Sequence, residues 1–211
     1  MNIHHHSILA ILMYWIAIGL SSSAYAQAEI GLSTNFQYFD YEEFDSNGKS
    51  LNHETGILPG LQLLVSLHQE KLIHTFTGSV HGGDVDYDGQ LQNGTPHETE
   101  TDTLLYQVSY RLTHPIISEK VFIHSQINYD HWSRSINPTF SVNGLDEAYD
   151  WPSIDFGFSF SLAKTRKHEL LIDASYSKVF EGDFEVDLSS QGFGVQKLDL
   201  GDGKGFQSTL S

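Results

Sequence analysis

The 211-residue sequence contains no cysteine and only five prolines. The absence of cysteine excludes disulfide-bonded scaffolds, thiolate metal sites and cysteine nucleophiles. Basic residues are also scarce, since 11 Lys and Arg stand against 27 Asp and Glu, for a formal net charge of −16. A chain this acidic lacks the basic surface that phosphate recognition needs, so we expect it not to bind nucleic acid.

Long apolar runs are confined to the N-terminus. Residues 8–20 are almost entirely apolar, but the run is shorter than the roughly 20 residues that a spanning helix needs. Ala24 and Ala26 supply small residues at the −3 and −1 positions of a cleavage site. This pattern predicts a secretory signal peptide over residues 1–26, cleaved after Ala26. The mature chain, 27–211, has the length of one domain.

Apolar residues alternate with small or polar ones through the mature chain. The clearest case is 154–162, IDFGFSFSL, in which every second residue is apolar. Similar alternation occurs at 57–67, 104–112 and 170–176, and weaker versions at 31–41, 71–83, 120–132 and 196–211. A period of two is typical of strands rather than helices. The sequence therefore predicts an all-β, antiparallel fold with eight strands.

The alternation alone leaves open which face is buried. In a soluble sandwich the apolar face turns inward, whereas in a membrane barrel it meets lipid. The polar faces here hold Gly, Ser, Gln and Asn rather than surface Lys and Glu, and short connections alternate with longer ones at 44–55, 84–102, 133–150 and 181–196. These features favour a transmembrane β-barrel in the cell outer membrane, with outer-membrane lipid and lipopolysaccharide around it and the barrel-insertion machinery as its partner during assembly.

Charged and aromatic residues follow the same division. The acidic residues concentrate in the long connections, and several lysines lie at the short turns. Solvated loops explain this, but Ca²⁺ or Mg²⁺ bridging the carboxylates to anionic surface lipid is a second interpretation. Aromatic residues near strand ends predict an interfacial girdle: Tyr38, Tyr41, Tyr129, Trp132, Trp151, Tyr176 and Phe180.

The C-terminal residues affect the expected strand number. Eight strands can close a barrel, but outer-membrane barrels resemble one another in ending on an aromatic residue that the insertion machinery recognises. This sequence ends FQSTLS, with Ser211 last. We therefore expect one further hairpin, which would make the eight visible strands part of a ten-stranded barrel.

One segment has the residue spacing of a calcium loop. Asp84, Asp86 and Asp88 precede Gly89 in a D-x-D-x-D-G pattern, in which alternate oxygens could bind a hard cation. The twelfth position is Thr95 instead of the bidentate Glu. The competing interpretation is a strand with three acids on one face.

The same segment carries a family resemblance. Residues 82–88, GGDVDYD, resemble the segment of the omptin outer-membrane proteases that carries their aspartate pair, and the similarity extends to 41–43 and 102–105. The resemblance implies a ten-stranded barrel in which Asp86 and Asp88 orient the water that attacks a peptide bond. Omptins also need an Asp-x-His pair after the seventh strand, where this sequence reads EGDFEVD over 181–187 and has no histidine after His168.

The sequence therefore predicts an outer-membrane β-barrel that is not an enzyme. Its acidic surface loops suggest a structural or surface-interaction role. Two alternatives remain open. One is an omptin-like aspartate-type protease that uses Asp86 and Asp88, and the other is a soluble periplasmic β-barrel or sandwich that binds a ligand.

Overall fold

The fold is known from a computed structural model that describes residues 27–69, 71–90, 94–117, 120–140, 142–164 and 169–210. The predicted signal peptide lies outside these ranges. The strands are β1 (Gln27–Phe44), β2 (Ser50–Gln69), β3 (Leu72–Gln90), β4 (Pro96–Ile117), β5 (Val121–Ile136), β6 (Leu145–Lys164), β7 (Glu169–Val179), β8 (Gly182–Leu188), β9 (Gly194–Leu200) and β10 (Gly203–Leu210). A 3₁₀ turn, Ser189–Gln191, precedes β9. The all-β prediction is confirmed.

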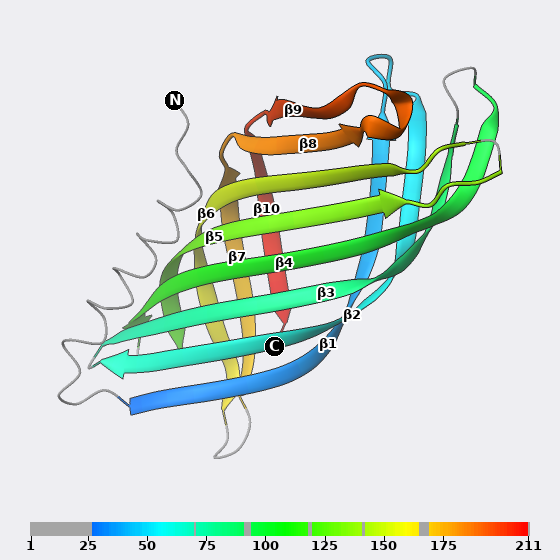
Figure 1. Cartoon of the computed structure of the whole chain (residues 1–211). Helices are drawn as coiled ribbons and strands as arrows, with labels where there is room; N and C mark the ends of the chain where they lie inside the picture. Colours follow the sequence, from blue (N-terminus) through cyan, green and yellow to red (C-terminus); the bar gives the residue numbers. More distant parts are fainter. Residues whose placement is uncertain are drawn as a thin grey trace.

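The strands form one antiparallel meander in the order β1-β2-β3-β4-β5-β6-β7-β10 (Figure 1). β7 and β8 lie end to end along the same edge of β6, because β7 pairs with its residues 153–164 and β8 with residues 146–150. β10 and β9 pair with β7 and β8 in the same way. The ten strands therefore act as eight long ones, two of which are interrupted.

This interruption corrects the sequence-based boundaries. The stretch 181–196 was expected to be a long connection, but it contains β8, and the expected final strand 196–211 is divided between β9 and β10. The other long connections are also mostly strand. β3 continues to Gln90 and β4 begins at Pro96. Backbone pairing continues where the apolar alternation stops, so hydrophobic periodicity marks only part of each strand.

The connection between β1 and β2 shows how little loop remains. Asp45 Oδ1 accepts hydrogen bonds from the backbone N–H groups of Asn47 and Lys49, at 2.8 and 2.9 Å. Gly48 adopts φ 77°, which favours glycine. The Asn-Gly dipeptide thus closes a tight turn, as its composition indicates.

The sheet is open within the described residues. β1 pairs only with β2, and β10 only with β7, so the two ends of the meander are not joined. In the same ranges, no helix has the length and apolar character needed to cross a membrane. We call the end of the sheet that carries the β1–β2, β3–β4 and β5–β6 connections the loop end, and the opposite end the short-turn end. The sheet bends strongly, and the halves of β1 and β2 nearer the loop end cross behind the middle strands (Figure 1).

Candidate functional site

The two faces of the sheet have opposite character. We call the face that carries Arg134 the inner face and the other the outer face. On β6 the outer side chains Phe156, Phe158 and Phe160 are 57%, 47% and 42% exposed, whereas the neighbouring inner side chains Asp155 and Ser159 are 5% and 7% exposed. Folding into a soluble core would bury the apolar face instead. The arrangement on β6 is therefore inverted.

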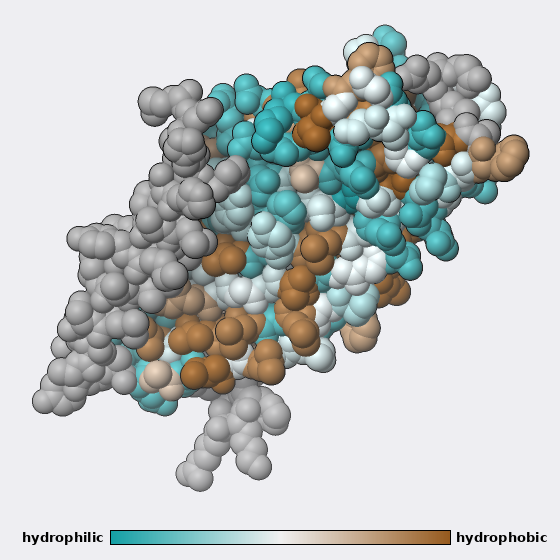
Figure 2. Space-filling view, viewed as in Figure 1, coloured by the Kyte–Doolittle hydropathy of each residue, from teal (hydrophilic) through white to brown (hydrophobic). Residues whose placement is uncertain are grey.

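The inversion extends across the sheet. Exposed apolar side chains include Ile30, Leu32, Phe36, Leu61, Leu63, Val80, Val108, Ile123, Ile127, Leu170, Ile172, Tyr176 and Phe206. The buried polar ones include Ser66, Ser109, His124, Asn128, Ser153 and Ser175. Figure 2 shows hydrophobic side chains gathered on the half of this face nearer the short turns, with hydrophilic ones toward the loop end. We call the exposed apolar surface the apolar belt.

Polar aromatic side chains lie where the apolar belt ends. Tyr129 donates a hydrogen bond to Asp150 Oδ1 at 2.8 Å, and His131 Nδ1 lies 2.8 Å from the same oxygen. The His131 ring stacks on Tyr106 with a centroid distance of 4.4 Å. Among the predicted girdle residues, Tyr129 therefore lies at a border between apolar and polar surface.

Three other predicted girdle residues face inward, which corrects that part of the prediction. Tyr41, Trp132 and Trp151 belong to or pack against a core cluster at the loop end, formed by Phe39, Leu58, Val85, Trp132 and Tyr149. Tyr41 and Trp132 meet edge to face, with ring centroids 4.7 Å apart. These rings come from opposite parts of the meander, so they hold the loop-end half of the sheet together as a packed core.

Arg134 lies at the centre of this core and joins four strands. From β5, its guanidinium reaches Glu43 on β1 at 3.0 Å, Glu54 on β2 at 2.7 Å and Glu147 on β6. The Tyr41, Trp132 and Tyr149 rings surround it, with centroids 5.2, 5.3 and 5.9 Å from Cζ. We call this arrangement the Arg134 cluster. It ties the loop ends of β1 and β2 to β5 and β6.

The electrostatics of the Arg134 cluster are unbalanced. Burial lowers the pKa of Arg134, but Glu147 and Glu54 outweigh this effect and hold it above its usual value. Burial raises the pKa of Glu54 to about 6, although Arg134 opposes the rise. One guanidinium thus faces three carboxyl groups, and the inner face is short of positive charge at this point.

The predicted calcium residues lie on the outer face. Asp84, Asp86 and Asp88 are exposed along β3, which continues as strand through all three residues. Their register partners on β4 are also acidic: Asp102, Glu100 and Glu98. We call these six residues the acidic ladder. A hydrogen bond with Asp84 raises the pKa of Asp102. In the part of the chain that the structure describes, no three His, Asp or Glu side chains are arranged to hold a metal ion.

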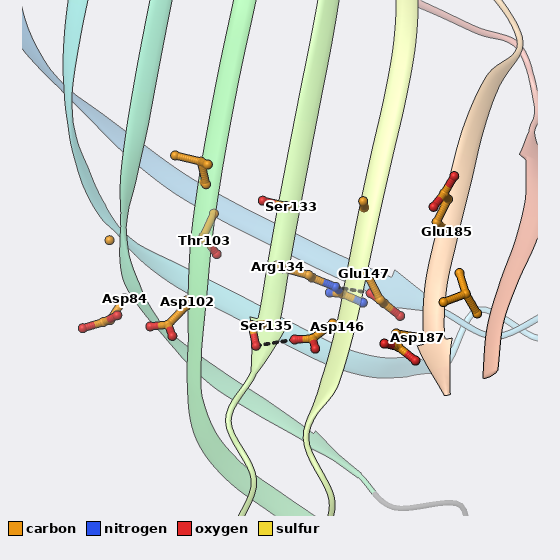
Figure 3. Close-up of a pocket in the computed structure, with 14 residues that line it drawn as sticks. Asp84, Asp102, Thr103, Ser133, Arg134, Ser135, Asp146, Glu147, Glu185 and Asp187 are labelled. Carbon is orange, nitrogen blue, oxygen red and sulfur yellow. Dashed lines mark hydrogen bonds and ion pairs between the residues drawn. The ribbon is translucent and has the colours of Figure 1, made fainter. Parts of the chain in front are cut away.

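A shallow hollow of about 540 Å³ lies beside this acidic ladder (Figure 3). Asp84, Asp102, Asp146 and Asp187 border it, and the small residues Ser133 and Ala148 form part of its lining. Carboxylates outnumber the single cation of this lining, Arg134, so the hollow has negative surroundings.

The residues that match omptins also lie on the exposed outer face. Asp86 and Asp88 point the same way from alternate positions of β3. Asp88 is the register partner of His53, whose Nε2 lies 3.1 Å from Asp40 Oδ1. A histidine–carboxylate pair on β1 and β2 therefore stands next to the aspartates. This pair could not be predicted from sequence, because it depends on strand register.

A second polar network fills the inner face nearer the short turns. Asp173 Oδ2 accepts hydrogen bonds from Arg111 at 3.0 Å and Ser159 at 2.7 Å. His124 Nδ1 lies 3.3 Å from Ser159 Oγ, and its Nε2 has no partner. The aspartate binds the serine directly instead of orienting the far nitrogen of the histidine. This geometry differs from a nucleophile–base–acid relay.

This network borders a cavity of about 400 Å³. Its lining is mostly hydroxyl and amide groups, including Gln62, Thr75, Gln107 and Ser109. The lining residue Gln126 donates to Asn128 Oδ1 at 2.5 Å. Asn128 in turn donates to Ser153 and Asp155 at 3.0 and 2.8 Å. The inner face is therefore largely polar nearer the short turns and packs an apolar, aromatic core at the loop end.

Comparison with known proteins adds no family to these observations. No protein-family model matches the sequence, and no curated protein matches it.

Proposed function

We propose that this protein is an integral β-barrel of the outer membrane, without catalytic activity, that serves a structural or surface-interaction role. The observation that carries the proposal is the inverted burial. Apolar side chains are exposed on the outer face while Ser, Asn, His and Asp side chains are buried on the inner face. Monomeric soluble proteins rarely expose large contiguous apolar patches, and alternation of apolar-out and polar-in is the pattern of transmembrane barrels.

The open ends of the meander fit this proposal if they are paired in the membrane. Lipid offers no hydrogen bonds, so an unpaired strand edge is not tolerated there. An even number of long strands makes β1 antiparallel to the β9–β10 edge, which is the direction that closure requires. Closure by these edges gives eight strands, and closure through one further hairpin gives the ten expected from the omptin resemblance.

The charge distribution supports a direction of insertion. Lys71 and Lys120 are exposed at the short-turn end, and carboxylates dominate the loop end. Short turns on the periplasmic side and loop-end extensions outside the cell are the usual asymmetry. The acidic ladder would then stand just above the outer leaflet, where Ca²⁺ or Mg²⁺ could bridge it to lipopolysaccharide.

Fractionation tests the proposal. The protein should stay with the membrane until detergent is added, and the extracted protein should migrate differently on gels before and after heating. Release with the periplasmic fluid would support the soluble binding protein instead. Cleavage of a dibasic peptide that is lost in both Asp86→Ala and Asp88→Ala would support the protease.

A further inference from the structure

Glu54 Oε2 in the Arg134 cluster and Asn52 Oδ1 beside the cluster are buried oxygen atoms without partners. Trp132 Nε1 and the hydroxyl oxygens of Thr101 and Thr103, which also face the cluster, are unpartnered too. Glu54 and Asn52 lie on β2, two positions apart, and both are buried on its inner face. If Glu54 is ionised, its Oε2 and Asn52 Oδ1 are both hydrogen-bond acceptors and neither can satisfy the other. Buried acceptors without a donor are costly.

A proton on Glu54 would satisfy both of these acceptors. It converts Oε2 into an O–H donor, for which we infer Asn52 Oδ1, two positions away on the same face of β2, as the acceptor, and it leaves Oε1 to accept from Arg134 at 2.7 Å. Asn52 Nδ2 is already used, since it donates to Glu43 Oε2 at 2.7 Å. The proton also removes one negative charge from a cluster in which three carboxyl groups face one guanidinium.

The cluster is also the contact that closes the loop end. Arg134 is 80 positions from Glu54 and 91 from Glu43, and Phe39 on β1 packs against Trp132 on β5 at 5.6 Å. In the structure the loop ends of β1 and β2 pack against β5 and β6, and we call this arrangement the docked state. We propose that Glu54 binds a proton in the docked state and that this proton stabilises it. The inference goes beyond the proposed function and does not depend on it, because the cluster lies beyond the apolar belt.

The charges around Glu54 set the direction of the effect. The titratable groups that face the cluster are Arg134 from β5, Glu147 and Tyr149 from β6, Glu43 and Tyr41 from β1, and Tyr87 from β3. β4 presents the uncharged Thr101 and Thr103. Burial raises the pKa of Glu54 from 4.5 to about 6. A group whose pKa is raised by docking favours the docked state as pH falls, and this gain is lost as pH rises through 6.

Distance measurements between two spin labels test whether the docked state depends on pH as proposed. The chain has no cysteine, so Leu51→Cys on β2 and Asn143→Cys beyond β5 can be labelled alone. We expect a single short distance at pH 5 and a second, longer one at pH 8. The ratio of docked to undocked protein should fall by about 8-fold between pH 5 and pH 8, and most of this fall should occur as the pH rises through 6.

Three variants separate the effect of the Glu54 proton from general effects of pH. Glu54→Gln replaces the O–H donor with an amide donor, so it should stay docked at both pH values. Asn52→Ala removes the acceptor and should lower the midpoint. Glu42→Gln, on the exposed face of β1, is the matched control and should keep the wild-type response.

The proposal is overturned if the wild-type distances are the same at pH 5 and pH 8. It is also overturned if Glu54→Gln keeps the wild-type response. Should Glu54→Gln not fold, an unchanged midpoint in Asn52→Ala contradicts the shared proton.

Discussion

At the scale of single residues, Arg134 decides how the loop end is packed. Its guanidinium supplies donors to carboxyl groups from three other strands and lies among three aromatic rings. A buried charge is costly unless its partners are all in place. Glu54 and Glu147 are also buried and Glu43 is half-buried, so removing the one cation leaves several anions without compensation.

Replacing Arg134 with Met should therefore destabilise the folded protein by about 3–5 kcal/mol. Lys197→Met is the matched control, because Lys197 also pairs with a glutamate, Glu185, but is 73% exposed. Exposed pairs contribute about 0–1 kcal/mol. Urea unfolding in detergent, followed by tryptophan fluorescence, measures both. Equal losses in the two variants would show that the Arg134 cluster is not a stabilising centre.

At the scale of elements, β6 could be predicted from the sequence, whereas the full length of β3 could not. The alternation of Phe156, Phe158 and Phe160 is visible in the sequence and fixes both the strand and its two faces. The extension of β3 through Asp84, Asp86 and Asp88 is not, because acids on both β3 and β4 resemble loop composition. Only the register, which pairs them with acids of β4, shows that they belong to a ladder.

Gly157 on β6 is required by close packing on the inner face. A Cβ there would lie 2.6 Å from His124 Nε2 and closer still to the Ala174 carbonyl oxygen. We expect Gly157→Ala to cost about 1–3 kcal/mol through overpacking. Gly78→Ala on β3 should be neutral or better, since a Cβ there meets no atom within 4 Å. Thermal unfolding compares the two, and an unaffected Gly157→Ala would contradict the packing described.

A substitution of Phe158 tests whether the outer face meets lipid or water. In lipid, Phe158→Arg should cost about 2–4 kcal/mol and reduce insertion. Phe193→Arg is the control, because Phe193 is 71% exposed in the connection before β9. Folding into vesicles of defined lipid, followed by urea titration, measures both. If Phe158→Arg folds as well as the control and needs no lipid, the outer face meets water.

At the scale of the whole molecule, two halves have different designs. The half nearer the short turns is apolar outside and polar inside. Period-two patterning predicts its strands and their two faces, and the Gly, Ser, Gln and Asn content of the polar faces predicts which face is inside. The loop-end half packs aromatic rings and Arg134 inside an acidic exterior, and this could not. Its contacts join residues as far apart as Glu43 and Arg134, 91 positions along the chain, and local patterning carries no information about such pairs. Trp132 was assigned to the girdle for the same reason.

The orientation of the strands in lipid can be measured directly on β6. Single cysteines at positions 155, 156, 158, 159 and 160, each carrying a nitroxide, would report contact with oxygen dissolved in the bilayer and with a water-soluble nickel complex. We predict that positions 156, 158 and 160 are accessible to oxygen and shielded from nickel, and that 155 and 159 are not accessible to oxygen. Nickel access at 156, 158 and 160, in protein that remains folded without detergent, would contradict the account.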